Sequence, residues 1–80
     1  MRPWTPVSVQ WTDAHGGDSG WEDPEDLPHE PTEVTTVGLL YKKTKKGVTV
    51  VCNRNLRYTS GYTFIPTGNI ISLTPLVPKK

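Results

Sequence analysis

The amino-acid sequence predicts an all-β fold, a small five-stranded barrel with a long acidic loop after its first strand. Two observations predict it. Apolar and polar residues alternate over short stretches rich in β-branched side chains, and Gly or Pro interrupts the chain between these stretches. Residues 1–80 are expected to form a single domain with a small core, since a chain of this length buries only about 60–65% of the surface that it exposes when unfolded. An enclosed cavity of enzyme size is therefore not expected.

The first strand is predicted over 7–12, where Val7, Val9 and Trp11 lie on one face and polar residues on the other. The next segment, 13–33, contains Gly and Pro breakers and shows no helical periodicity, which predicts a long loop. It carries all eight acidic residues of the chain and both histidines. Loops of this length within compact domains are uncommon, and they are either functional or disordered.

The second half of the chain predicts four more strands. A central hairpin has a lysine-rich tip that ends in Gly47, and Pro66 ends the strand that follows, because proline lacks the backbone donor that a further ladder bond requires. A turn at 67–69 leads into the last short strand, and 77–80 is expected to be a frayed tail. The four strands are expected at 35–42, 47–53, 61–66 and 70–73.

This order of elements resembles that of SH3-like and Sm-like barrels over about residues 6–76. The features that carry the resemblance are the long early loop, the central hairpin, and Ile65-Pro66 followed by an isoleucine strand that starts at Ile70. The resemblance implies a tight helical turn between the last two strands.

A second resemblance is to small accessory proteins of tailed bacteriophages. It is carried by short fragments and their spacing, namely Val9-x-Trp11-x-Asp13-Ala14, Gly20-Trp21, Val37-Gly38-Leu39-Leu40, Val48-Thr49-Val50, and Ile65-Pro66 with Ile70. The resemblance implies a viral accessory protein that is expressed in the cytoplasm of a bacterial host. It implies no particular activity.

Cys52 is the only cysteine, so no intrachain disulfide can form. No apolar stretch approaches the ~18 residues needed to cross a bilayer, and the N-terminus lacks the basic and apolar regions of a signal segment. These observations favour an intracellular, soluble protein with no membrane partner. Because Cys52 shares an apolar strand face with Val48 and Val50, we expect its thiol to be buried and unreactive.

The acidic loop does not match known metal-site patterns. Thirteen residues separate His15 from His29, whereas zinc sites use short spacings. A calcium-binding EF-hand loop starting at Asp13 would need Gly at its sixth and Glu at its twelfth position, where Asp18 and Pro24 stand. No Ser or Cys nucleophile can be placed beside Asp13 and His15. The sequence therefore predicts no metal, no cofactor and no enzymatic activity.

Cations and aromatic residues are interleaved in the second half of the chain. This pattern suits nucleic acid or nucleotides, because cations neutralise phosphate while flat rings and guanidinium planes stack on bases. In a structural alternative, the lysines at the hairpin tip only protect a sheet edge from aggregation. The candidate binding residues are Trp21, Lys42, Lys43, Lys45, Lys46, Arg54, Arg57, Tyr58 and Tyr62.

Trp21 has two interpretations, because it lies between a glycine and an acidic run. As an anchor, which is the interpretation we favour, it packs on the core and pins the loop, with Leu27 as a second anchor. As an exposed residue it is a recognition hot spot. Of the other tryptophans, we expect Trp11 in the core and Trp4 near the edge of the barrel.

The leading functional hypothesis is a non-enzymatic phage accessory protein that binds and sequesters or inhibits a host component, for example in counter-defence. The alternatives are a nucleic-acid or nucleotide binding module and a virion or assembly component. The partner is thus expected to be a host protein or an anionic ligand. Because residues 13–33 are acidic and eight of the nine basic residues lie between Lys42 and Lys80, we also expect a homo-oligomer in which the loop of one copy meets the hairpin of the next.

Overall fold

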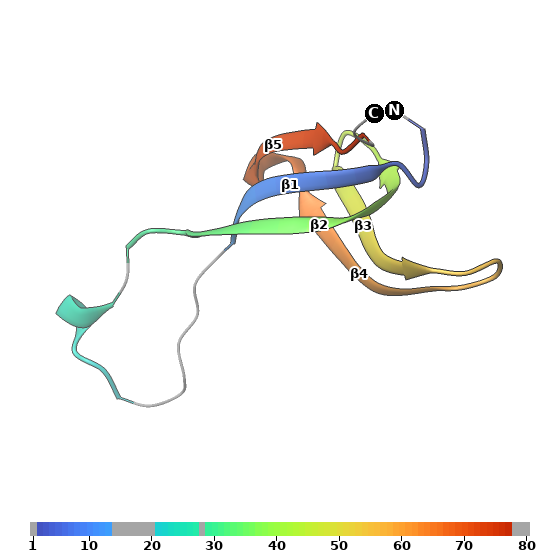
Figure 1. The fold of residues 1–80 in the computed structure, drawn as a ribbon. Helices are drawn as coiled ribbons and strands as arrows, with labels where there is room; N and C mark the ends of the chain where they lie inside the picture. The colour runs from blue at the N-terminus through green and yellow to red at the C-terminus, as the bar shows by residue number, and fades with distance from the viewer. Residues whose placement is uncertain (1, 14–20, 28, 78–80) are drawn as a thin grey trace.

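The computed structural model describes residues 2–13, 21–27 and 29–77, and it arranges them around one five-stranded sheet (Figure 1). Single turns of 3-10 helix lie in two of the connections, η1 (Pro24–Asp26) and η2 (Thr67–Asn69). The strands are β1 (Pro6–Asp13), β2 (Thr32–Lys43), β3 (Gly47–Arg54), β4 (Thr59–Pro66) and β5 (Ile70–Pro75). The predicted all-β class and the five strands are confirmed.

The strand order is β4-β3-β2-β1-β5, and every neighbouring pair is antiparallel. The sequence predicts a five-stranded barrel without indicating whether it closes, and here the strands β4 and β5 form the two edges, so the sheet is not closed. Along the chain, β4 ends at Pro66, which has no amide hydrogen to extend a ladder, and η2 separates β4 from β5. Among the described residues, no helix is long and apolar enough to cross a membrane.

The predicted acidic loop is shorter than expected at both ends. Asp13 pairs with Thr32, and Thr12 pairs with Glu33, so the ends of the 13–33 segment belong to β1 and β2. Polar side chains are compatible with these positions because this end of the β1–β2 ladder lies beyond the core. Positions 14–20 and 28 of the predicted loop, and 78–80 of the predicted tail, lie outside the described residues.

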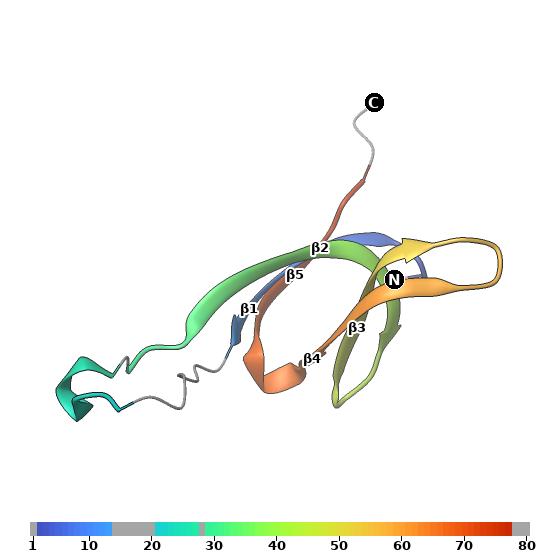
Figure 2. The ribbon, with the colours of Figure 1, turned by 90° about the horizontal axis from the view of Figure 1, so that it is seen from below.

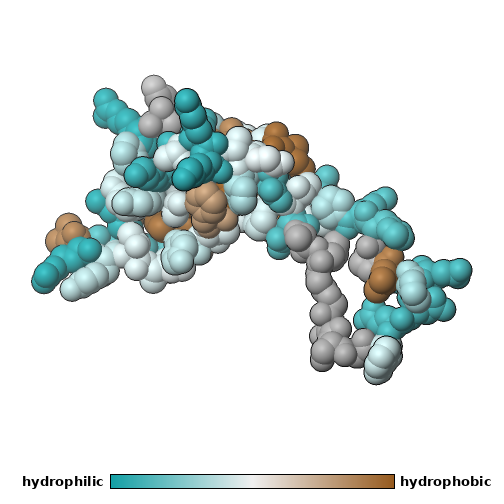
Figure 3. Space-filling model, turned by 180° about the vertical axis from the view of Figure 1, so that it is seen from behind, coloured by the Kyte–Doolittle hydropathy of each residue, from teal (hydrophilic) through white to brown (hydrophobic). Residues whose placement is uncertain are grey.

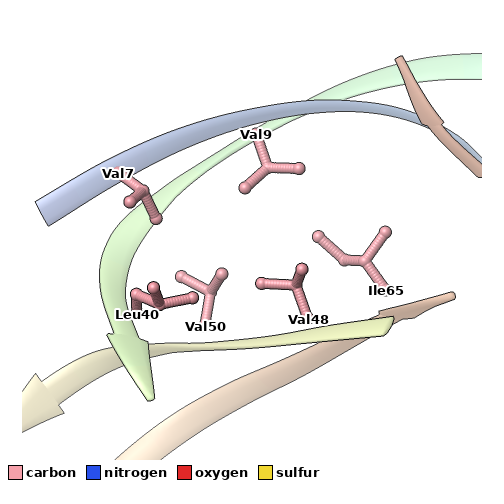
Figure 4. Close-up of a cluster of buried hydrophobic side chains, with 6 residues drawn as sticks. All are labelled: Val7, Val9, Leu40, Val48, Val50 and Ile65. Atoms are coloured by element: carbon pink, nitrogen blue, oxygen red, sulfur yellow. The ribbon is translucent and has the colours of Figure 1, made fainter. Parts of the chain in front are cut away.

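The core lies between β1 and the hairpin formed by β3 and β4 (Figure 4). Alternating residues of these strands, with Leu40 from β2, point inward and form a cluster in which each side chain is at most 3% exposed: Val7, Val9, Leu40, Val48, Val50 and Ile65. Trp11, Ile70 and Leu73 are only partly buried and pack against this cluster from the rim, whereas the sequence predicts Trp11 within the core. The indole nitrogen of Trp11 donates a hydrogen bond of 2.9 Å to the Thr36 hydroxyl, which satisfies the polar end of this half-buried ring.

The bend of β2 brings β1 over β3 (Figure 2). In the same strand, a Cβ atom at Gly38 would lie 2.5 Å from the Val51 carbonyl oxygen and 2.7 Å from a methyl group of Val50. A larger residue therefore could not approach β3 this closely. A register shift between Leu40 and Lys42 follows the bend and adds twist at the end of the strand.

The hairpin of β3 and β4 continues past the core and projects from the body of the protein (Figure 1). Cys52 lies on this projecting part and is exposed, so the prediction of a buried thiol is wrong. Alternation correctly places Cys52 on the face of Val48 and Val50, but the core ends before it reaches that position. The Cys52 side chain lies instead over Gly61, which has a positive φ of 68°.

Candidate functional site

The N-terminal turn places Trp4 above the end of the sheet. The Thr5 amide and hydroxyl both donate to the Arg2 carbonyl, at 3.3 and 2.7 Å, which closes the turn. The Trp4 amide then donates to the Leu40 carbonyl, and the Leu40 amide donates back to Thr5 at 2.9 Å. Trp4 is held with a φ of 67°, a left-handed conformation that costs a non-glycine residue roughly 1–3 kcal/mol. Such strain persists only where surrounding contacts fix the residue.

Two side chains from other strands contact the Trp4 ring. The ring of Tyr41, at the end of β2, has its centre 5.4 Å from that of Trp4, and the two planes are tilted by 41°. The guanidinium carbon of Arg54, at the end of β3, lies 4.0 Å from the centre of the Trp4 ring. The Trp4 ring therefore contacts both the Tyr41 ring and the Arg54 guanidinium group, and the three residues come from separate parts of the chain.

The tip of the β3–β4 hairpin adds a second cation–aromatic pair. The side-chain oxygen of Asn55 accepts hydrogen bonds from the amides of Arg57 and Tyr58, both at 2.8 Å, and the Asn55 amide donates to the Tyr58 carbonyl. Asparagine suits this position because its short side chain caps the turn that it starts. The turn holds the Arg57 guanidinium carbon 5.6 Å from the centre of the Tyr58 ring.

The two pairs line one surface hollow of about 360 Å³, together with Asn55, Leu56 and Thr59. We call Trp4, Tyr41, Arg54, Arg57 and Tyr58 the aromatic–cation surface. No acidic residue is among those that line the hollow. A second hollow of about 410 Å³ shares Tyr41 with the first and extends past Pro3 to Lys42 and Lys43, so two lysines flank the aromatic–cation surface.

The structure brings some of the predicted binding residues together and separates others. Arg54, Arg57 and Tyr58 line the same hollow, and Lys42 and Lys43 border it. Lys45 and Lys46 lie on the β2–β3 turn, which is tied to η2 because Thr67 donates to both of their carbonyls. Tyr62 is on the opposite face of the β3–β4 hairpin from Arg54, because side chains alternate along paired strands.

Trp21 does not have the role that we favoured from the sequence. Its side chain is 103% exposed, and Leu27 is 45% exposed, so neither residue anchors the segment on the core. A local device shapes the segment instead: the Asp23 carboxylate caps η1 by accepting from the Glu25 amide at 3.0 Å. In Figures 1 and 2 this segment lies at one end of the protein and the β3–β4 tip at the other.

Trp4 and Tyr41 belong to the site but were not among the predicted binding residues. Their proximity depends on the N-terminal turn and on the shift of register after Leu40, neither of which leaves a periodic pattern in the sequence. One available signal is the placement of Trp4 between two prolines, which favours a turn over a strand.

Among the described residues, no three His, Cys, Asp or Glu side chains lie close enough to hold a metal ion. No protein-family model, curated protein or solved structure matches the chain. The geometry of the aromatic–cation surface is therefore the main guide to function.

Proposed function

We propose that the protein is a non-enzymatic binding module and that its aromatic–cation surface binds single-stranded nucleic acid or nucleotides. The observation that carries the proposal is the Arg54 guanidinium stacked at 4.0 Å over Trp4, with Tyr41 on the same ring. A guanidinium held in this way offers one planar face to a base and N–H donors to phosphate. Base stacking on such a platform contributes about 1–3 kcal/mol per base and tolerates any sequence.

The cations around the surface support an anionic ligand. Arg54 and Arg57 lie within the hollow, and Lys42 and Lys43 lie where it continues past Tyr41. All four side chains are exposed, so they can contact phosphates without the free-energy cost of burying a charge. The rings of Tyr58 and Tyr41 lie among these positive groups and can stack on further bases. Rings and cations thus alternate on the protein as bases and phosphates alternate along a nucleotide strand.

The strand order and η2 also support an SH3-like or Sm-like assignment within the all-β class. In this chain β5 pairs with β1, β1 with β2, β2 with β3 and β3 with β4, and a single 3-10 turn joins β4 to β5. A bacteriophage accessory role in a host cytoplasm remains a prediction, because it depends on sequence fragments rather than on this surface.

The test is binding of a fluorescently labelled single-stranded oligothymidylate, followed by anisotropy. Trp4→Ala and Tyr58→Ala are each expected to weaken binding by about 5- to 150-fold, the equivalent of losing one stacked base. Tyr62→Ala is the matched control, since this tyrosine of the same hairpin is also exposed but does not line the hollow. No binding by the parent protein, or equal losses for Tyr62→Ala and Tyr58→Ala, would overturn the proposal.

A further inference from the structure

Residues 21–27 and a hollow beside β5 have complementary chemistry. Trp21 and Leu27 flank a run that contains Glu22, Asp23, Glu25 and Asp26, and the side chains of all six residues are exposed. In Figure 3 this region appears as a hydrophilic lobe with an apolar side chain exposed on it. The segment therefore presents two exposed apolar side chains, those of Trp21 and Leu27, beside four carboxylates, and a partner site for it would have to be both apolar and basic.

The matching site lies beside the edge strand β5. Its volume is about 400 Å³, and we call it the β5 hollow. Val48 of the core forms part of its wall, with Ile70, Ile71 and Leu73 from β5, so its lining is largely apolar. Lys43, the last residue of β2, and Lys45 of the β2–β3 turn stand on its rim, and no acidic residue is among those that line it.

We propose that the occupant of the β5 hollow is the 21–27 segment of a second copy of this chain. Trp21 enters the apolar part, and the carboxylates of Glu22 and Asp23 face Lys43 and Lys45 on the rim. An indole ring supplies a contact area of about 150–250 Å² and fits within a hollow of this volume. Because the segment is acidic in every copy, contact between two such segments is electrostatically unfavourable. Charge complementarity therefore favours contact between the segment and the basic rim of a neighbour's hollow.

The geometry allows a reciprocal arrangement. If each of two copies donates its segment to the hollow of the other, one two-fold axis relates two identical contacts, and the assembly closes as a dimer. Because exposed ion pairs supply little affinity, Trp21 and Leu27 provide most of the binding free energy, and the charged groups set orientation and rate. Lys43 also flanks the aromatic–cation surface, but Trp21 and Leu27 line neither of its hollows, so the Trp21→Ala, Leu27→Ala protein tests this proposal separately from nucleic-acid binding.

Sedimentation velocity over a range of concentrations in low salt tests the proposal. The parent protein is expected to dimerise, and Trp21→Ala with Leu27→Ala to weaken dimerisation by about tenfold or more, as truncation of a central aromatic residue does. Leu56→Ala is the control, because Leu56 is equally exposed but lies at the tip of the β3–β4 hairpin. On the rim, Lys43→Glu with Lys45→Glu is expected to weaken dimerisation, whereas Lys42→Glu with Lys46→Glu, which alter residues outside the hollow, is expected to have little effect.

Mixing the two defective proteins gives the sharpest result. The Trp21→Ala, Leu27→Ala protein keeps an intact hollow, and the Lys43→Glu, Lys45→Glu protein keeps an intact segment. Each alone is expected to stay monomeric at a concentration where their equimolar mixture forms a dimer through the one remaining contact. A monomeric parent protein at about 100 μM, equal effects of test and control variants, or no dimer in the mixture overturns the proposal. Circular dichroism of each variant confirms that the substitutions, all at exposed positions, leave the fold intact.

Discussion

Arg54 and Trp4 form a cation–aromatic stack, with the guanidinium carbon 4.0 Å from the ring centre. Tyr41 contacts the same ring with centres 5.4 Å apart, so the end of β3, the end of β2 and the N-terminal turn meet at one aromatic side chain. This contact helps to explain how Trp4 keeps its left-handed backbone conformation. The stack is thus both a structural tie and the platform of the proposed binding surface.

Arg54→Ala is expected to lower the free energy of unfolding by about 0.5–1 kcal/mol, the contribution of an exposed cation–aromatic pair. Arg54→Lys is expected to recover only part of this loss, because an ammonium group lacks the plane that stacks on the ring. Urea unfolding followed by tryptophan fluorescence measures both effects. Arg57→Ala is the control, since Arg57 lies farther from its ring, 5.6 Å, at the tip of the hairpin. Equal losses for the two alanine variants would contradict a special role for the Arg54 contact.

Gly61 and Gly68 form a matched pair for testing the projecting hairpin. Gly61 has a φ of 68°, and a Cβ atom there would lie 3.2 Å from the Cβ atom and 3.4 Å from the sulfur of Cys52. Gly61→Ala is therefore expected to cost about 1–2 kcal/mol from the backbone conformation alone. Gly68 has no atom within 4 Å of its would-be Cβ and no positive φ, so Gly68→Ala is expected to be neutral or to stabilise by up to about 1 kcal/mol. Thermal unfolding of the two variants measures the difference. Similar melting temperatures would argue against backbone strain in the Gly61→Ala variant.

The strands could be predicted from the sequence because local patterns encode them. Alternation around Val7 and Val9, the β-branched runs on either side of Gly47, and the two short apolar runs on either side of Pro66 and the 67–69 turn predict the five strands, with ends that differ by at most three residues. Closure could not be predicted, since it depends on how far the bend of β2 carries β1 across the hairpin, and a period of two carries no information about curvature. The exposure of Cys52 was missed for the same reason: alternation gives the face but not where the core ends.

The candidate site was predictable only where its residues are close in sequence. Arg54, Arg57 and Tyr58 come from one hairpin end, and their interleaving of charge and ring is visible in the sequence. Trp4 and Tyr41 join them through long-range contacts that no local pattern reports. The role of Trp21 as an anchor was wrong because an aromatic residue in an acidic run has no periodic partner that indicates whether it packs inward.

Val9 lies in the core, and Val37 lies on the outer face of the sheet. Val9 is fully buried in the main cluster, whereas Val37 is 59% exposed on β2. Val9→Ala is expected to cost roughly 1.5–3 kcal/mol, and Val37→Ala to change stability by less than about 0.5 kcal/mol. For a domain of this size the first change lowers the melting temperature by about 4–8 °C for each kcal/mol. Calorimetry at low protein concentration measures both, and a large loss for Val37→Ala would show that the outer face is covered in solution.

The salt dependence of oligothymidylate binding counts the cations that contact phosphate. For single strands, the logarithm of the binding constant falls with the logarithm of the salt concentration with a slope of about −0.7 per neutralised phosphate. If Arg54, Arg57, Lys42 and Lys43 each contact one phosphate, the slope is about −2.8, and binding weakens about 50-fold between 50 and 200 mM salt.

Lysine variants test which cations the ligand follows. Lys42→Gln with Lys43→Gln removes the two charges that flank Tyr41, so the slope is expected to fall in magnitude by about 1.4. Lys45→Gln with Lys46→Gln removes the same charge from the β2–β3 turn, which Thr67 holds against η2, and is expected to leave the slope unchanged. Anisotropy titrations at four salt concentrations give each slope. If the Lys45 and Lys46 substitutions reduce the slope and those at Lys42 and Lys43 do not, the ligand follows the hairpin turn, and the aromatic–cation surface is not its path.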